Sequence, residues 1–344
     1  MCGCDAAPLV VGVTAPVVVV SCGDRSANDA ADRIALEYGP NQPCYYPTLN
    51  VFRFAMTRSR YLASSLLLMI AGAGSAQRGT LMIVGGGPQP SALVQQFVDL
   101  AGGRGRAKIA VFAEASADGQ KSGEEKAAEL TSLGADAKNI WVTRDEANTD
   151  SIAKRLTEVT GVWFGGGDQS RLIKVLRGTK TDSAIRARYQ SGAVIGGTSA
   201  GAAVMSQIMI TGDERHPGGD RRDTTNAYLT IARDNIVTDT GFALVGSAII
   251  DQHFLRRKRH SRLISLVLES APHLGVGIDE STALIIPPSG PWRIAGASAA
   301  VIYDARNAAV TPASAHVLGA TGIQMHVLPA GSTFDVKTGK ATLP

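Results

Sequence analysis

Short apolar runs alternate with helix-like patterns along most of the chain. The apolar runs predict strands at 80–84, 108–113, 139–142, 161–164 and 192–195. Helical patterns follow these runs at 93–100, 124–133, 151–159, 171–176 and 202–205. Strands that are buried on both faces read as continuous apolar runs, and their alternation with helices implies βαβ units. The pattern therefore predicts a doubly wound α/β domain with a mostly parallel sheet in a three-layer αβα arrangement.

The pattern changes in the last third of the chain. Apolar runs at 247–250 and 276–278 still read as strands. Further runs, which are separated by turn residues and suggest antiparallel strands at a sheet edge, lie at 299–303, 316–318 and 324–328. We see no internal repeat and no low-complexity linker, so we expect a single domain at 78–344.

The segment before residue 78 differs from the rest. Met56 opens a basic stretch, an apolar run extends from residue 62 to about 73, and small residues occupy 74–76. These are the three parts of a secretory signal peptide, and the apolar run is too short to span a bilayer. A buried core helix is the alternative. We expect a signal peptide at 56–76, a non-native or disordered extension at 1–55, and a periplasmic or secreted protein with no stable membrane anchor.

The composition excludes several kinds of partner and site. The chain has 344 residues, of which 44% are hydrophobic, so most of it should be globular. A net charge of +4 is too small to argue for a nucleic-acid partner. All four cysteines precede Met56 in the sequence, at Cys2, Cys4, Cys22 and Cys44. The predicted domain therefore has no disulfide, no thiol nucleophile and no zinc–thiolate site.

Residues 197–201 (GTSAG) fit the Gly-x-Ser-x-Gly pattern of a nucleophile elbow. A strand pattern precedes them and a helix pattern follows, so Ser199 would lie at a sharp turn, with the Ala200 N–H directed at a developing oxyanion. The competing interpretation is a Gly-rich turn that only packs or that binds phosphate. A phosphate loop would need a Lys followed by Ser or Thr, and neither this turn nor residues 85–88 supply that pair.

A serine nucleophile needs a general base. Among six histidines, His253 directly follows the apolar run at 247–250, and strand ends are where doubly wound sheets carry their chemistry. The orienting acid should also follow a strand, which favours Glu280, with Asp279 in reserve. The alternatives are a structural histidine and two solvated loop acids.

A basic run at 254–263 begins directly after this histidine and carries five Lys and Arg side chains. Such a run is usually a solvated helix face or an anion-binding patch. Because the run directly follows His253, part of it must face the cleft that contains this histidine. Arg259 and Arg262 share a face if the stretch is helical. Because Arg binds carboxylates bidentately, the run predicts a carboxylate-rich substrate.

Four segments together resemble the cyanophycinases, which belong to a serine peptidase family that also contains aspartyl dipeptidase. The segments are 197–202 (GTSAGA), 251–254 (DQHF) with the Arg257, Arg259, Arg262 and Leu263 that follow it, 165–169 (GGGDQ) and 277–284 (GIDESTAL). The resemblance covers roughly residues 80–290. It implies a fold similar to that of the class I glutamine amidotransferases.

The resemblance implies a Ser199–His253–Glu280 triad that needs no metal or cofactor. It implies hydrolysis of cyanophycin, a poly-aspartate that carries arginine on its β-carboxyls, to β-Asp-Arg dipeptides by a serine-type exopeptidase. Backbone amides of Ala200 and of Gly166 and Gly167 would hold the oxyanion. The implied substrate pocket is lined by Gln169, Asp251, Gln252, Arg257, Arg259 and Arg262.

Two alternatives stay open at this point. An aspartyl dipeptidase would share the elbow but act on short peptides with an N-terminal aspartate, and a non-catalytic periplasmic binding protein would keep only the fold. An amidotransferase would need a cysteine nucleophile, and none follows Cys44. A polar insertion at 215–233 departs from the family pattern and is a candidate lid. We expect cyanophycin or β-linked Asp-Arg peptides as partners, and a homodimer.

Overall fold

The computed structural model describes residues 79–214 and 230–344. The expected extension at 1–55, the signal peptide at 56–76 and most of the insertion at 215–233 lie outside these residues. No helix in the described part of the chain is long and apolar enough to cross a membrane. The same residues contain no cluster of three or more His, Cys, Asp or Glu side chains that could hold a metal ion.

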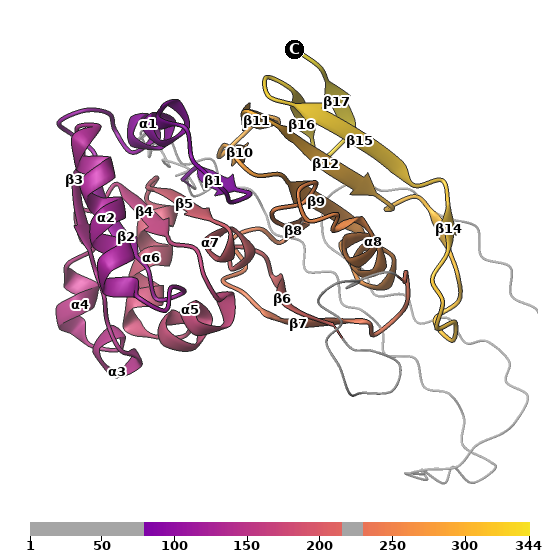
Figure 1. Cartoon of the computed structure of the whole chain (residues 1–344), viewed down its shortest axis with the longest axis horizontal. Coiled ribbons are helices and arrows are strands. Elements are labelled where there is room, and N and C mark those ends of the chain that lie inside the picture. The colour runs from indigo at the N-terminus through magenta and orange to yellow at the C-terminus, as the bar shows by residue number, and fades with distance from the viewer. Residues whose placement is uncertain (1–78, 215–229) are drawn as a thin grey trace, which may run out of the picture. The chain divides into compact units, whose positions relative to one another are not determined.

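A nine-stranded sheet forms the centre of the fold (Figure 1). In spatial order its strands are β17 (Lys340–Thr342), β16 (Thr333–Asp335), β11 (Trp292–Gly296), β10 (Thr282–Ile286), β1 (Leu81–Val84), β5 (Val194–Thr198), β4 (Gly161–Phe164), β2 (Lys108–Phe112) and β3 (Asp136–Asn139). The strands from β1 to β3 pair in parallel, whereas those from β10 to β17 extend the sheet in antiparallel fashion. The predicted α/β class with a parallel sheet and C-terminal antiparallel strands is confirmed.

Helices cover both faces of the parallel half. On one face, α1 (Ser91–Leu100) and α2 (Gly119–Ser132) bury Phe97 and Leu130 in one apolar cluster with Val111 of β2. A second cluster, on the other face, receives side chains from α3 (Arg144–Ala147), α4 (Asp150–Lys154), α5 (Gln169–Leu176), α6 (Lys180–Gln190) and α7 (Ala200–Ala203). The alternation of apolar runs and amphipathic helices thus produces the expected three layers.

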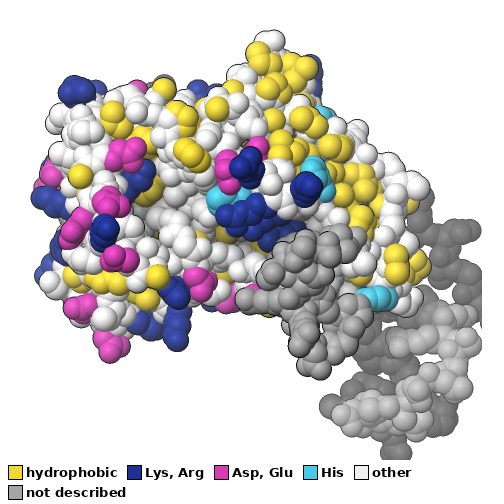
Figure 2. Space-filling model, viewed as in Figure 1, with side chains coloured by type: hydrophobic (Ala, Val, Ile, Leu, Met, Phe, Trp, Pro, Cys, Tyr) yellow, Lys and Arg dark blue, Asp and Glu magenta, His cyan; other side chains and the backbone are white. Residues whose placement is uncertain are grey.

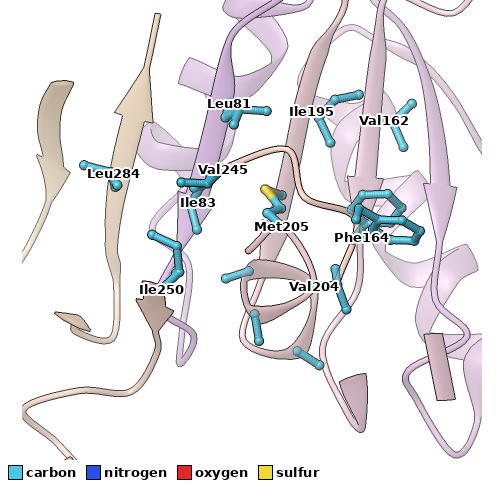
Figure 3. Close-up of a cluster of buried hydrophobic side chains, with 14 of the residues drawn as sticks. Leu81, Ile83, Val162, Phe164, Ile195, Val204, Met205, Val245, Ile250 and Leu284 are labelled. Atoms are coloured by element: carbon cyan, nitrogen blue, oxygen red, sulfur yellow. The ribbon is translucent and has the colours of Figure 1, made fainter. Parts of the chain in front are cut away.

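A second sheet of four strands was not predicted as a separate unit. Its strands, in spatial order, are β15 (Gln324–Pro329), β12 (Ala299–Asp304), β9 (Leu274–Ile278) and β8 (Ile249–Asp251). One face shares a buried cluster with the central sheet, as Figure 3 shows for Ile250 beside Ile83 and Leu284. The other face packs in a further cluster with α8 (His260–Glu269). Two-stranded sheets are formed by β6 (Ile208–Glu214) with β7 (Ile236–Thr240), and by β13 (Ala309–Val310) with β14 (Ala320–Thr321).

Two predicted strands are misplaced. The strand expected at 139–142 is β3 at Asp136–Asn139, and the apolar Ile140 and Val142 that suggested it are buried just after the strand ends. No strand occurs at 316–318, where Val317 is 72% exposed and makes only an isolated bridge to Ala232. In both cases apolar residues mark a connecting segment rather than a strand.

Candidate active site

Ser199 lies between β5 and α7, at the turn that the sequence predicts. Its backbone has φ 53° and ψ −111°, a conformation that is strained for a residue with a side chain. Its N–H donates to the Val84 carbonyl of the neighbouring strand at 3.1 Å. The small residues of α7 let the helix pack closely, since a Cβ on Gly201 would lie 2.7 Å from the Phe164 carbonyl carbon. The serine is therefore held by backbone geometry on both sides.

His253 follows β8 of the second sheet and is buried. It also has a positive φ, 49°, and its N–H donates to the Gly85 carbonyl at 2.6 Å. Gly86, with φ +106°, lies directly against the imidazole, because a Cβ there would be 2.5 Å from Nε2 and 2.9 Å from Nδ1. The glycine turn after β1 thus forms a wall for the histidine ring.

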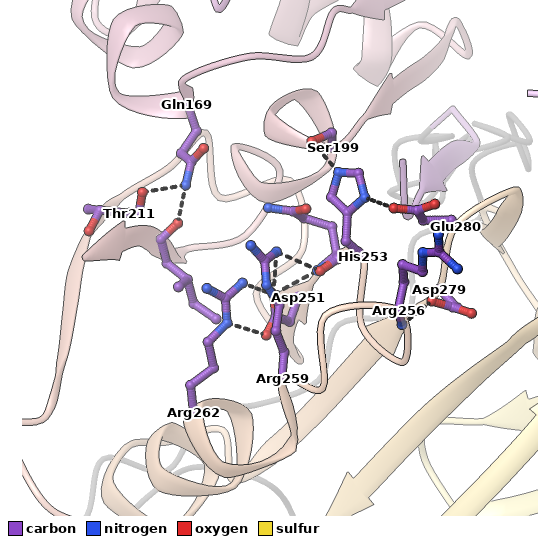
Figure 4. Close-up of polar contacts among 12 residues, drawn as sticks. Gln169, Ser199, Thr211, Asp251, His253, Arg256, Arg259, Arg262, Asp279 and Glu280 are labelled. Carbon is purple, nitrogen blue, oxygen red and sulfur yellow. Dashed lines mark hydrogen bonds and ion pairs between the residues drawn. The ribbon is translucent and has the colours of Figure 1, made fainter. Parts of the chain in front are cut away.

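The three predicted catalytic side chains form one hydrogen-bonded line (Figure 4). Ser199 Oγ lies 2.8 Å from His253 Nε2, and His253 Nδ1 lies 2.6 Å from Glu280 Oε1. The histidine and the glutamate come from the ends of β8 and β9, which are parallel neighbours in the second sheet. The serine comes from the central sheet, so the line crosses from one sheet to the other.

Asp279, the reserve acid, is occupied elsewhere. Its Oδ1 accepts the Arg256 backbone N–H at 3.0 Å, and its Oδ2 accepts the Ser298 hydroxyl at 2.8 Å. It therefore ties the loop after His253 to the turn before β12. Between the two acids, Glu280 is the one that meets the histidine.

Burial lowers the pKa of His253 below its ordinary 6.5. The hydrogen bond to the Glu280 carboxylate opposes this effect, while the nearby positive charges of Arg257 and Arg259 add to the lowering. The imidazole is therefore neutral at pH 7, which leaves one ring nitrogen able to accept a proton. A neutral histidine beside a serine hydroxyl can act as a general base.

The backbone amides expected to hold an oxyanion lie on either side of Ser199. Ala200 is the first residue of α7, where an N–H has no acceptor within the helix. Gly166 lies beside the serine, because a Cβ on it would be 3.5 Å from Ser199 Cβ. Gly167, with φ +136°, packs instead against the backbone at Ala115 and Ser116. Their roles stay predictions.

Gln169 and Gln252 are both buried near the site but differ in their contacts. The Gln169 side-chain amide donates to the backbone carbonyls of Ile210 and Thr211 at 2.7 and 2.6 Å, so it anchors β6. The Gln252 side-chain oxygen has no hydrogen-bond partner among the described residues. A buried carbonyl oxygen without a partner is unusual in a folded protein.

Asp251 and Arg262 lie close together, but not as the sequence interpretation expected. Each is 1% exposed, and the Arg262 guanidinium binds both oxygens of Asp251 (Figure 4). Arg259 lies 3.8 Å from the same carboxylate and donates to the Gln252 carbonyl at 2.7 Å. As the structure stands, the first two side chains pair with each other and do not line an open pocket.

Arg257 differs from these two arginines because its side chain is exposed. With the exposed Arg256 and Lys258 it forms a basic patch next to the histidine. Figure 2 shows Lys and Arg side chains gathered beside a histidine on the visible face. Such a patch attracts anions to the catalytic line.

Two features beside the catalytic line were missed by sequence reasoning. The turn at 85–87 supplies the wall against His253, although its glycines suggested only a strand end. Thr198 Oγ1 is buried next to Ser199 without a hydrogen-bond partner among the described residues. A Gly-rich turn after the first strand is a visible signal, whereas nothing in the sequence marks the orphan hydroxyl.

The chain is similar to proteins that are already known. The model of peptidase family S51 matches residues 81–290. The chain belongs to peptidase family S51. It is a serine-type peptidase, and Ser199, His253 and Glu280 all lie within the matched residues.

Curated relatives of the chain carry the name cyanophycinase. The one from Synechococcus elongatus is 30% identical over 77% of this chain and 81% of its own length. The one from Geminocystis herdmanii (strain PCC 6308) is 28% identical over 76% of this chain and 95% of its own length. In structure, a peptidase from an acI-B1 Actinobacterium matches with a TM-score of 0.54 at 20% identity, over 75% of this chain and 97% of that one. The last likeness concerns the fold alone.

Proposed function

We propose that this family S51 peptidase hydrolyses cyanophycin to β-Asp-Arg dipeptides as an exopeptidase, with a Ser199–His253–Glu280 triad. The observation that carries the proposal is the hydrogen-bonded line of 2.8 and 2.6 Å that joins the three side chains. The choice of cyanophycin as the substrate rests on the relatives named cyanophycinase, which match about three quarters of the chain.

The chemistry starts at His253 Nε2, which accepts the Ser199 Oγ proton as the oxygen attacks the substrate carbonyl carbon. Nδ1–H donates to Glu280, which fixes the tautomer and stabilises the imidazolium that forms. The imidazolium then gives its proton to the leaving amine. A water molecule, which His253 Nε2 activates by accepting its proton, then releases the acyl group from the serine.

The negative charge on the carbonyl oxygen needs donors that are already in place. The Ala200 N–H is available at the start of α7, whereas the Ser199 N–H is used by Val84. Gly166 is the better placed of the two glycines for a second donor, because it lies beside Ser199. Each such donor typically contributes about 3 kcal/mol to the transition state.

Substrate carboxylates would meet the basic patch of Arg256, Arg257 and Lys258 beside the histidine. Because these side chains are exposed, they can bind an anion without breaking an internal pair. The Gln252 side-chain oxygen would supply an acceptor for a substrate N–H or guanidinium if substrate binding uncovers it. Cation and acceptor together suit a chain that carries both carboxylates and arginine.

The deciding experiment is dipeptide release from purified cyanophycin by the protein and by Ser199→Ala. We expect β-Asp-Arg from the wild type, and a loss of about 10⁴-fold or more in the variant. Ser191→Ala, at an exposed serine on the end of α6, serves as the matched control and should release product at the wild-type rate. Release by Ser199→Ala at an undiminished rate would contradict the assignment of the nucleophile.

The other outcomes separate the alternatives. Cleavage of short peptides with an N-terminal aspartate, without polymer turnover, would favour an aspartyl dipeptidase. A folded wild-type protein that binds cyanophycin but is not labelled at Ser199 by a serine-directed phosphonate would favour a binding protein.

We also propose export through the signal peptide at 56–76, and a homodimer. Both proposals come from the sequence and concern residues or contacts outside the described structure. Mass analysis of the protein recovered from the periplasm should give an N-terminus at Gln77. Light scattering should give twice the chain mass.

A further inference from the structure

The strand β3 forms one edge of the central sheet (Figure 1). It pairs with β2 on one side, where the Ile140 N–H donates to the Val111 carbonyl at 2.8 Å. Because backbone groups alternate in direction along a strand, those of Ala137 and Asn139 point away from β2. Among the described residues no second strand pairs with β3, so this edge presents open donors and acceptors to an extended chain.

A cavity of about 520 Å³ lies along this edge. Both helical layers contribute to it, because Glu124 belongs to α2 on one face of the sheet, whereas Arg155 ends α4 on the other. Its volume is in the range of about 300–1,000 Å³ that is typical of ligand pockets. The polar and aromatic residues that line it are Gln120, Glu124, Lys138, Asn139, Trp141 and Arg155.

Trp141 provides an aromatic surface in this cavity. It is 41% exposed, whereas the other two tryptophans of the chain, Trp163 and Trp292, are buried. Its ring packs against Gly119, since a Cβ on that glycine would overlap the ring. The indole is therefore held on one side and partly open on the other. An open indole face attracts a guanidinium group through its π electrons.

The charges that line the cavity are of both signs. Glu124 accepts from the Gln120 side-chain amide and forms no ion pair within the described part of the chain. Arg155 is exposed and likewise has no ion-pair partner there. Lys138 is exposed as well, and its ammonium lies 3.7 Å from Asp136. A ligand that carries both a guanidinium and a carboxylate would find an opposite charge for each group.

We propose that this cavity is an accessory site that binds the cyanophycin chain three strands away from β5, with a substrate guanidinium on Trp141 and Glu124. The inference rests on the proposed function, because each unit of that substrate carries a guanidinium and a carboxylate. The carboxylates meet Arg155 and Lys138. A second copy of this protein is the other candidate occupant, but a lysine on a short edge strand disfavours edge-to-edge association of two sheets.

The first test is a titration of tryptophan fluorescence in Ser199→Ala, which should hold the chain without cleaving it. The probe is a synthetic chain of four β-Asp-Arg units. We expect a saturable change in the emission of Trp141, and no change at any concentration would overturn the inference. Adding Glu124→Gln should weaken binding about 2- to 5-fold. Adding Glu125→Gln, the exposed neighbour on α2 that does not line the cavity, should leave binding unchanged.

The second test compares the kinetics of Trp141→Ala on two substrates. KM for cyanophycin should rise about 3- to 30-fold, because the stacking surface is lost. The value of kcat/KM should stay at that of the wild type for a chain of two units, the shortest that contains a bond to cleave. Met325→Ala, at a 53% exposed apolar side chain on β15, is the control and should match the wild type on both substrates. An unchanged KM for cyanophycin in Trp141→Ala would overturn the inference.

The remaining outcomes keep the two proposals apart. A wild type that does not cleave the two-unit chain would reject the proposed function, and the fluorescence titration would still test the accessory site. A change from dimer to monomer in Trp141→Ala, with unchanged KM for cyanophycin, would assign the cavity to a contact between copies and overturn the inference. Glu124→Gln covers the case in which Trp141→Ala does not fold, because Glu124 is exposed.

Discussion

Three residues of the catalytic line, or next to it, have unusual backbone conformations. Ser199, His253 and Ser281, which follows Glu280, have φ values of 53°, 49° and 55°, and none of them is a glycine. Residues in this region are strained, and strain of this kind is concentrated at functional sites. The relative positions of Ser199, His253 and Glu280 are therefore determined mainly by backbone contacts rather than by side-chain rotamers.

Gly86 gives the sharpest test of this view. In Gly86→Ala the new Cβ would overlap the His253 ring, so the imidazole must move away from Ser199. We expect kcat to fall about 100-fold or more while the far-UV circular dichroism is unchanged. Gly290→Ala is the control, because Gly290 also has positive φ, +86°, but faces open space. An active Gly86→Ala protein would show that the glycine wall is not needed.

Arg257 provides a prediction for pH dependence. Its charge helps to hold the pKa of His253 below 6.5, so its removal raises that pKa. Because catalysis requires neutral histidine, the acid limb of kcat/KM in Arg257→Met should move to higher pH. The shift should shrink in 1 M salt, where charges are screened within about 3 Å. Arg256→Met, at the exposed neighbouring residue, should leave the acid limb of kcat/KM at its wild-type pH. An acid limb that does not move in Arg257→Met would contradict the electrostatic account.

Part of this site could be predicted from the sequence. A serine in a Gly-x-Ser-x-Gly turn, and a histidine and an acid directly after apolar runs, predict residues at strand ends, and the structure brings all three together. The pairing of Asp251 with Arg262 could not be predicted. A charged residue type shows what a side chain can bind, but only the fold decides whether its partner is a substrate or another residue.

At the scale of elements, α7 shows how small residues position Ser199. Its four residues, Ala200–Ala203, are all buried, and the helix passes close to the backbone of β4. Larger side chains at these positions would push the helix start away from β4. The elbow is therefore sensitive to volume at the helix as well as at the serine.

Gly201→Ala tests this packing. The added methyl would lie 2.7 Å from the Phe164 carbonyl carbon, so strand and helix must separate. Overpacking of this kind costs about 1–3 kcal/mol, which corresponds to a fall in Tm of several degrees. Gly246→Ala, whose nearest neighbour would be at 3.8 Å, should melt within a degree of the wild type. Equal melting temperatures for both variants would show that α7 tolerates the volume.

The elements themselves were predictable to different degrees. The parallel strands and their helices follow from alternating apolar runs, and most bounds agree to within a few residues. The split of the last third into two sheets was not foreseen. The strand β10, which joins the central sheet, was not predicted. Periodicity identifies a strand but not its partner, so the predicted strands that correspond to β9 and β12 could not be assigned to a second sheet.

At the scale of the whole molecule, one buried acid couples folding to pH. Glu114 is 2% exposed and accepts one backbone N–H, from Val142 at 3.3 Å, while its other oxygen has no partner among the described residues. Burial raises the pKa of this carboxyl to about 8. The folded protein therefore holds the proton between pH 4.5 and 8, whereas the unfolded chain releases it.

This difference makes Glu114 destabilising as pH rises. The free energy of unfolding that the protonated Glu114 carboxyl contributes is fully present below pH 4.5. It is lost between pH 4.5 and 8, at no more than about 1.4 kcal/mol per pH unit. Glu114→Gln should therefore gain free energy of unfolding relative to the wild type between pH 5 and pH 8, as measured by urea denaturation. Glu125→Gln, at an exposed position on α2, should show no such gain. A wild type and Glu114→Gln with parallel pH profiles would refute the coupling.

The pairing of β1 with β10 also sets the order of events during synthesis. Val84 pairs with Ala283, and the turn after β1 lies against His253. The contacts of the first strand are therefore completed only when residues that are synthesised much later are present. At about 5–20 residues per second, that delay is on the order of tens of seconds. Ser199 precedes His253 and Glu280 in the sequence, so the hydrogen-bonded line of the three side chains can form only after the segment through Glu280 has emerged from the ribosome or, in an exported protein, from the translocation channel.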